Sequence, residues 1–186
     1  MVRLKLALLW VLAALLAACA AMPAPDDAGA REATAASSGA EIPLSVQGGL
    51  GFTLDPDTFL MAARADYWVR PNVAVGPLLQ VGLADHRTIL APSFNVKGVF
   101  DLKQPSAERL KPYIDGGVGF AYLEKDGRRG DDDDLGVLLD IGGGLSYDVN
   151  DHLAVGTGVL FNFLPAELVG ERFFFSWQLV TLSFRF

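Results

Sequence analysis

Cysteine, histidine and positive charge are scarce in this sequence. One cysteine and two histidines among 186 residues exclude a disulfide within the chain and a cysteine-built metal site. The 15 basic side chains are outnumbered by 22 acidic ones, and such a surface repels polyphosphate, so nucleic acid is not an expected partner. The sequence also has no phosphate-binding loop, dinucleotide-binding fingerprint or metal-ligand spacing, so we expect no cofactor and no resident metal.

The longest apolar run lies at the start of the chain. Two basic residues precede the uninterrupted apolar residues 6–18, which predicts a secretory signal peptide over residues 1–18 that is too short for a stable membrane span. The motif Leu16-Ala17-Ala18-Cys19 resembles the bacterial lipobox, and this resemblance implies lipid attachment at Cys19. Cleavage after Ala20 by a general signal peptidase is the alternative. In the sorting rule for such lipoproteins, alanine at position 20 is compatible with transfer to the outer membrane.

Residues 19–43 are rich in alanine and contain no aromatic side chain. This composition predicts a flexible linker, which as a random coil would span about 25 Å. From residue 44 onward, apolar residues alternate with small or polar ones, and the period of two predicts β-strands separated by turns rich in Gly, Pro, Asn and Asp. We expect eight strands, at 44–54, 58–70, 73–84, 89–102, 111–124, 135–149, 153–164 and 172–186.

The two faces of these strands differ in a way that selects between two kinds of barrel. In the fifth strand, Ile114, Val118 and Phe120 share one face, while Asp115 and Gly117 lie on the other. A soluble barrel places its bulky apolar face inward, whereas a membrane barrel places it outward around a small or polar interior. The glycine-rich second face favours the membrane barrel. The sequence therefore predicts an all-β fold, an eight-stranded antiparallel up-and-down transmembrane barrel over residues 44–186.

Three stretches, at residues 111–122, 142–156 and 183–186, resemble the small eight-stranded outer-membrane barrels typified by OmpA, OmpX and OmpW. The resemblance implies a cell outer membrane location with membrane lipid around a monomeric barrel. It also implies that Phe186 is the terminal aromatic residue that the barrel-assembly machinery reads. These motifs identify an architecture and say little about activity.

Six charged side chains, three of each sign, fall on the small or polar face. Buried charges persist only when they are paired and hydrogen-bonded, so we expect an interior polar network. Because eight strands leave an interior just wide enough for side chains to fill, the network favours a plug over a narrow pore. Its members are Arg64, Asp66, Lys97, Asp115, Asp140 and Arg185.

Other polar residues are weaker candidates. The run Asp131–Asp134 could bind a divalent cation, although a solvated loop is the more ordinary interpretation. His86 lies beside Asp85 and upstream of Ser93, but no catalytic motif surrounds these residues, so we expect no enzyme activity. Two residues break the strand pattern: Pro77 predicts a bulge, and Gln178, on the apolar face, predicts either a bulge or a place near the outer rim.

The expected function is a non-enzymatic one, either a structural role in the envelope or a narrow channel for small solutes. The alternative is a periplasmic lipocalin-like lipoprotein that carries an apolar ligand. Such a carrier would keep its large apolar residues inside, and it typically has a Gly-x-Trp motif near the first strand, which is absent from this sequence.

Overall fold

The structure is a computed structural model that describes residues 44–85, 87–102, 104, 107–127, 130–168 and 170–186. The predicted signal peptide, the predicted linker and Cys19 lie outside the described residues. So does the side chain of His86.

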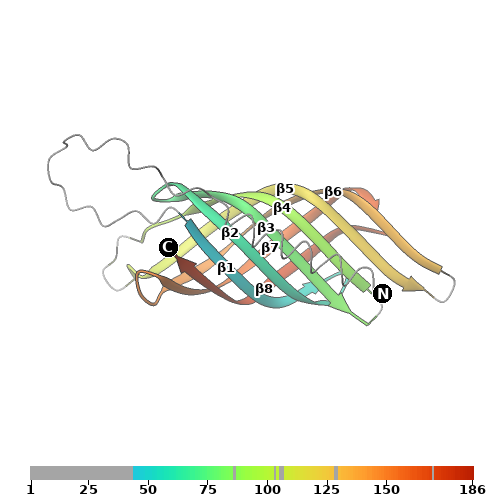
Figure 1. Ribbon diagram of the computed structural model, residues 1–186, viewed down its shortest axis with the longest axis horizontal. Helices are drawn as coiled ribbons and strands as arrows, with labels where there is room; N and C mark the ends of the chain where they lie inside the picture. Colours follow the sequence, from blue (N-terminus) through green and yellow to red (C-terminus); the bar gives the residue numbers. More distant parts are fainter. Residues whose placement is uncertain (1–43, 86, 103, 105–106, 128–129, 169) are drawn as a thin grey trace. The chain divides into compact units, whose positions relative to one another are not determined.

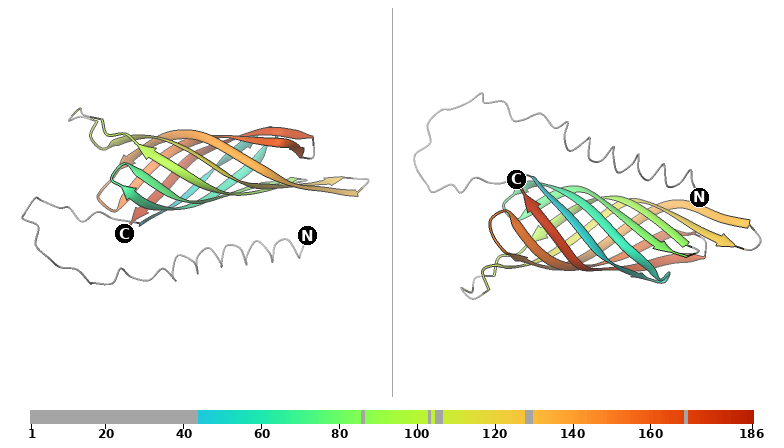
Figure 2. Two further views of the ribbon diagram at one scale, coloured as in Figure 1. Left: turned by 90° about the horizontal axis from the view of Figure 1, so that it is seen from above. Right: turned by 60° about the horizontal axis from the view of Figure 1, so that its bottom comes forward.

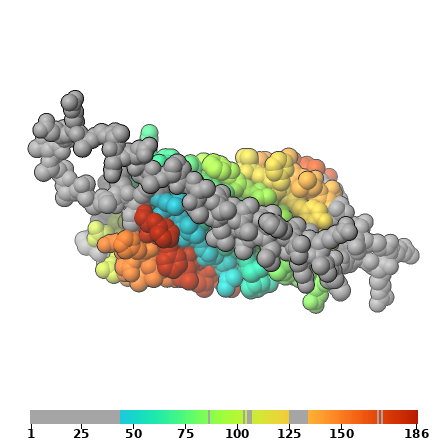
Figure 3. Space-filling view, in the orientation of Figure 1, coloured from blue at the N-terminus to red at the C-terminus, as the bar shows by residue number. Residues whose placement is uncertain are grey.

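Eight strands form one closed antiparallel barrel, in which each strand pairs with its neighbours in sequence and β1 pairs with β8 (Figure 1). The first and last strands lie side by side in Figure 3 as well. This confirms the expected up-and-down fold. The strands are β1 (Leu44–Leu54), β2 (Thr58–Arg70), β3 (Val73–Ala84), β4 (Arg87–Val99), β5 (Leu110–Gly127), β6 (Gly130–Asp148), β7 (Leu153–Leu168) and β8 (Glu171–Arg185).

The even number of strands brings both ends of the described chain to one end of the barrel. There the backbone N–H of Phe186 donates to the carbonyl oxygen of Leu44 at 3.0 Å. We call this the terminal end, and the opposite end, where β5 turns into β6, the hairpin end (Figure 2). In the part of the chain that is described, no helix is long and apolar enough to cross a membrane.

The expected alternation of faces is present, and it is inverted relative to a soluble protein. In β5, the outward side chains of Ile114, Val118 and Phe120 are each about 60% exposed, at 59%, 62% and 58%. The intervening Tyr113 and Asp115 point inward and are 8% and 7% exposed. Large apolar side chains thus cover the outside of the barrel, while charge is enclosed within it.

Three strands, β5, β6 and β7, are clearly longer at the hairpin end than the sequence pattern predicts. Residues 125–134, expected as a loop, belong largely to a hairpin in which β5 runs to Gly127 and β6 begins at Gly130. A β-hairpin needs only a two-residue connection, so polar residues with low strand preference can still extend the ladder. Similarly, β7 continues to Leu168, where a loop was expected from residue 165.

The two expected irregularities have different outcomes. The pairing of β2 with β3 keeps one register on both sides of Pro77, so the bulge predicted there is absent, and proline only removes a ladder donor. The bulge predicted from Gln178 is real: Gly51 pairs with Gln178 and Leu50 with Val180, which leaves Leu179 as the extra residue of β8. This extra residue turns Gln178 inward, where it is buried.

Candidate functional site

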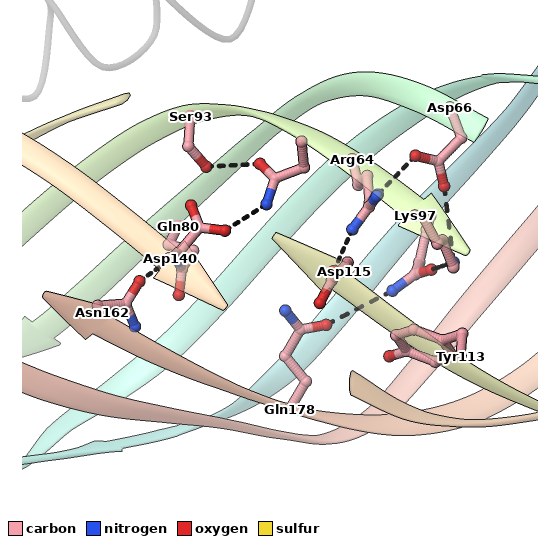
Figure 4. Close-up of polar contacts among 12 residues, drawn as sticks. Arg64, Asp66, Gln80, Ser93, Lys97, Tyr113, Asp115, Asp140, Asn162 and Gln178 are labelled. Atoms are coloured by element: carbon pink, nitrogen blue, oxygen red, sulfur yellow. Dashed lines mark hydrogen bonds and ion pairs between the residues drawn. The ribbon is translucent and has the colours of Figure 1, made fainter. Parts of the chain in front are cut away.

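Four charged side chains meet inside the barrel, and we call them the ion-pair cluster: Arg64 and Asp66 of β2, Lys97 of β4 and Asp115 of β5. Arg64 lies between the two carboxylates. Its Nε donates to Asp66 Oδ1 at 2.6 Å and its Nη1 donates to Asp115 Oδ2 at 2.5 Å (Figure 4). All four side chains are buried. A planar guanidinium suits this position because its fork of donors can serve two carboxylates at once.

Lys97 joins this cluster to an aromatic ring. Its Nζ lies 3.6 Å from Asp66 Oδ2, donates to Gln47 Oε1 at 3.3 Å, and lies 4.5 Å from the centroid of the Tyr113 ring. The ring in turn occupies space that Gly144 and Gly158 leave open. A Cβ on either glycine would come within 2.5 Å or 2.2 Å of the Tyr113 hydroxyl oxygen.

We expect Gly144→Ala to destabilise the barrel. The new methyl group would meet both the Tyr113 hydroxyl and the carbonyl oxygen of Thr157, the latter at 2.2 Å, so backbone and ring would have to move. Overpacking of this kind costs about 1 to 3 kcal/mol. Urea unfolding followed by tryptophan fluorescence measures the change. Gly48→Ala is the matched control, because nothing lies within 4 Å of its Cβ position; an equal loss in both variants would contradict the argument.

A second polar layer, which we call the amide cluster, lies farther toward the hairpin end. Asn95 donates from Nδ2 to Asp140 Oδ1 at 2.5 Å and accepts from the Ser93 hydroxyl at 2.8 Å. Across the barrel, Gln80 donates to Asn162 Oδ1 at 3.0 Å (Figure 4). Gln80, Asn95 and Asn162 are completely buried. Through uncharged donors, this layer connects β4 with β6 and β3 with β7, so it stabilises strands that are not neighbours in the sheet.

The charges of the predicted network are not all in one place. Arg185 is only partly buried and donates from Nη2 to Asp148 Oδ1 at 2.7 Å, at the terminal end. Arg64 and Lys97 therefore face Asp66, Asp115 and Asp140 in the deep interior, which leaves one negative charge in excess. Asp140 is the carboxylate without a basic partner among the described residues, and its Oδ2 accepts no hydrogen bond there.

An apolar layer closes the interior at the hairpin end, and the sequence analysis did not predict it. Its side chains come from β4 to β8 and are at most 4% exposed. We call it the apolar cap; its large members are Ile89, Leu123, Leu138, Leu164, Leu168 and Phe174. Unbroken apolar runs at residues 137–139 and 173–175 hide the alternation there, because large side chains occupy both faces. From the hairpin end inward, the interior thus passes from apolar cap to amide cluster to ion-pair cluster.

One small cavity lies between the described side chains of the interior. A cavity of about 10 Å³ lies beside the ion-pair cluster, bordered by Gln47, Tyr113 and Gln178, and it has room for about one water molecule. Arg64 Nη2 and Asp115 Oδ1, which also lie at this cavity, have no partner among the described protein atoms. A donor and an acceptor left open beside such a space suit one bridging water.

The bulge in β8 is supported from the outer surface by Thr157. Its hydroxyl donates to the carbonyl oxygen of Gln178 at 2.8 Å and accepts from Trp177 Nε1 at 3.2 Å. A bulge interrupts the ladder and leaves backbone groups in need of other partners. Thr157 therefore satisfies a carbonyl group that the irregular pairing exposes on an apolar surface.

We expect Thr157→Val to lower the free energy of unfolding by about 1 to 3 kcal/mol, because it keeps the shape but leaves the Gln178 carbonyl and the Trp177 N–H without their partner. Urea unfolding of the refolded protein gives the value. Thr157→Ser, which keeps the hydroxyl group, should retain most of the stability. Equal losses in the two variants would show that packing, and not the hydrogen bonds, matters at this position.

The remaining predicted residues that the structure describes lie apart from one another. Ser93 donates to Asn95 inside the barrel, and His152 lies at the terminal end, where its Nδ1 is 3.2 Å from the carbonyl oxygen of Arg185. Within the described ranges, no three His, Cys, Asp or Glu side chains gather as a metal ion would require. Of the run Asp131–Asp134, only the side chain of Asp134 is described, and it accepts a bond from the N–H of Leu135. A cation there stays a prediction.

Comparison with known proteins shows the fold. No protein-family model matches the sequence, and no curated protein matches it. Among solved structures, the N-terminal β-barrel domain of Pseudomonas aeruginosa OprF has a TM-score of 0.63 at 11% identity, and Neisserial surface protein A has 0.61 at 12%. The attachment invasion locus protein Ail of Yersinia pestis has 0.54 at 13%. Each match covers 77% of this chain and 96% of the other. The chain therefore has the fold of the small eight-stranded outer-membrane barrels.

Proposed function

We propose that this protein resides in the bacterial outer membrane and acts there as a closed, non-enzymatic structural barrel. The observation that carries this proposal is the inverted distribution of side chains. Ile114, Val118 and Ile141 project outward and are 59% to 62% exposed, whereas Arg64 and Asp66 are 4% and 2% exposed inside. In water such an outer surface would drive association, while in lipid it is the stable arrangement.

The layered interior supports a structural role over transport. A solute would have to displace the apolar cap, break the amide cluster and separate the ions around Arg64. The narrow channel therefore requires a large rearrangement of buried, hydrogen-bonded side chains. A lipocalin-like carrier is less favoured still, because the polar layers and the cavity of about 10 Å³ beside them offer no room for an apolar ligand.

Anchoring and assembly complete the proposal. Phe186 follows β8, donates from its N–H to the carbonyl oxygen of Leu44 and is 68% exposed, so its ring is available to the barrel-assembly machinery. A lipid on Cys19 would add a second anchor. Because the barrel closes on itself through β1 and β8, it needs no second copy to complete its wall, and a monomer is proposed.

Planar-bilayer recording tests the closed state. We expect the refolded protein to insert without steady conductance, because buried side chains of the apolar cap, the amide cluster and the ion-pair cluster fill the interior over the described residues. The protein is delivered to the planar bilayer from lipid vesicles, and protease protection of the protein in those vesicles verifies that it is inserted. A stable single-channel current from inserted wild-type protein would contradict the structural role and favour the narrow channel.

A further inference from the structure

The amide cluster is built around a glycine. Asn95, Gly117 and Asp140 lie at one level of three successive strands, since Asn95 pairs with Gly117 and Gly117 pairs with Asp140. A Cβ on Gly117 would lie 2.6 Å from Asn95 Cγ, so the amide of Asn95 passes over the glycine. It reaches Asp140 in this way and donates to Oδ1 at 2.5 Å. The missing side chain therefore lets an amide and a carboxylate two strands apart meet inside the barrel.

The directions of the hydrogen bonds fix which end of each amide faces which partner. Asn162 Nδ2 donates to the carbonyl oxygen of Phe174 at 3.3 Å and to Ser176 Oγ at 3.0 Å. Asn162 Oδ1 is then the atom that faces Gln80, which must present its Nε2 at 3.0 Å. A side-chain amide has one nitrogen and one oxygen, so the oxygen of Gln80 is directed away from Asn162 and needs another partner.

Two buried oxygen atoms of this cluster are left without a donor. Gln80 Oε1 and Asp140 Oδ2 accept no hydrogen bond from the described residues, and the two side chains are 0% and 5% exposed. Asp140 and Asn162 pair directly on the inner face of β6 and β7, which places their Cβ atoms about 5 Å apart. Because Gln80 contacts Asn162, its amide lies at the same level of the interior as Asp140 (Figure 4).

The charge of the interior indicates which kind of ligand fits. Arg64 and Lys97 are paired with Asp66 and Asp115, so the charge of Asp140 has no counterpart among the described residues. A water molecule could donate to both open oxygen atoms, but it would leave that buried charge uncompensated. A monovalent cation neutralises the charge, whereas a divalent cation would leave one positive charge in excess. Carboxylate and amide oxygen atoms are also the ligands that hard cations take.

We propose that the amide cluster binds one small monovalent cation, such as sodium, between Asp140 Oδ2 and Gln80 Oε1. The carboxylate supplies the negative charge, and the two open oxygen atoms supply the first ligands. Asn95 Oδ1 and Asn162 Oδ1 each have a second lone pair, with which they can complete the coordination from the same layer. This binding site goes beyond the proposed structural role. It rests on contacts inside the barrel, so it does not depend on where the protein resides.

Equilibrium unfolding at constant ionic strength tests the proposal. The full mature chain is unfolded with urea in a non-ionic detergent while sodium chloride replaces N-methylglucamine chloride, whose cation is too large for the cluster. Because the chain unfolds and refolds, the enclosed position of the site does not prevent exchange of the ion. For a dissociation constant of about 100 mM, raising sodium from about 10 to about 500 mM should increase the folding equilibrium constant about fivefold. Equal unfolding midpoints in the two salts would overturn the proposal.

Asp140→Asn separates the site from general effects of sodium. This variant removes the charge and keeps the shape of the side chain, so its folding equilibrium constant should change by less than about 1.5-fold over the same range. The matched control is Asp148→Asn, since Asp148 pairs with Arg185 at the terminal end. The control should keep the fivefold response to sodium. Sodium dependence that persists in Asp140→Asn, or that is lost in Asp148→Asn, would contradict binding at the amide cluster.

Infrared spectroscopy of the wild-type chain distinguishes the cation from a proton. Bound sodium leaves Asp140 as an ionised carboxylate, whereas a proton in its place would give the carbonyl stretch of a neutral acid. At neutral pH in sodium chloride, a chain with isotopically labelled aspartate should show aspartate carboxylate bands alone. A neutral aspartic acid band would overturn the proposal. This spectrum and the comparison of the two salts both use the wild-type chain, so they decide the matter even if a variant does not fold.

Discussion

Replacing Arg64 by methionine is expected to destabilise the barrel by about 3 to 5 kcal/mol, the cost of removing one partner from a buried ion pair. Arg64 donates to Asp66 at 2.6 Å and to Asp115 at 2.5 Å, and its loss leaves both carboxylates buried. Lys97 cannot take over, because its Nζ is already shared between Asp66 and Gln47. Urea unfolding in detergent micelles, followed by the fluorescence of Trp68 and Trp177, measures the loss.

Asp140→Asn is the matched control for this prediction. Asp140 is as deeply buried as Arg64, but it has no basic partner among the described residues. The asparagine side-chain oxygen can still accept the hydrogen bond from Asn95, while the unpaired charge disappears. We expect the stability to stay within about 1 kcal/mol of wild type or to rise. If Asp140→Asn costs as much as Arg64→Met, the interior does not depend on specific ion pairs.

Replacing Ile141 by arginine is expected to have the second large effect. Ile141 lies in the middle of β6 and is 60% exposed on the outer surface. In a lipid-facing position near the bilayer midplane, arginine costs about 2 to 4 kcal/mol, whereas an exposed isoleucine of a soluble protein tolerates the same change. Refolding into lipid vesicles and unfolding with guanidinium chloride give the free energy.

The control for Ile141→Arg is the same substitution at an outward position nearer the membrane surface. Val149 follows β6 at the terminal end and is 43% exposed, so Val149→Arg should cost only about 0 to 1 kcal/mol if that end lies at the membrane surface. A large loss at Ile141 with a small one at Val149 indicates a bilayer around the barrel. Neutral behaviour of both variants would mean that the outer surface meets water.

The sequence predicts the barrel well because its main signal repeats in every strand. Alternation at residues 113–122 already separates Ile114 and Val118 from Asp115 and Gly117, and one such strand fixes the faces of its neighbours through the ladder. The position of Gln178 on the apolar face also indicated the bulge in β8 as one of two explanations. One extra residue in a strand turns the side chains that follow it to the opposite faces, so a bulge allows Gln178 to point inward.

What the sequence does not predict depends on contacts across the barrel. Arg185 shares its face with Arg64, but its distance along the strand brings it to Asp148 at the rim. Phe174 and Leu138 sit in apolar runs, so a period of two cannot assign them to the interior. The length of the ladder between β6 and β7 is likewise not evident from the pattern, since this ladder ends at Leu139 and Phe163, two residues before Pro165.

The most direct test of the whole account is the electrophoretic mobility of the Cys19→Ala variant, extracted from outer-membrane fractions and run on SDS gels with and without boiling. The substitution removes the proposed lipid on residue 19 and leaves the barrel as the proposed anchor. The account predicts that the variant stays in the outer-membrane fraction and that its unboiled form migrates differently from the boiled one, as a barrel that resists SDS would. Release of the variant into the aqueous phase, with one mobility under both conditions, would contradict it.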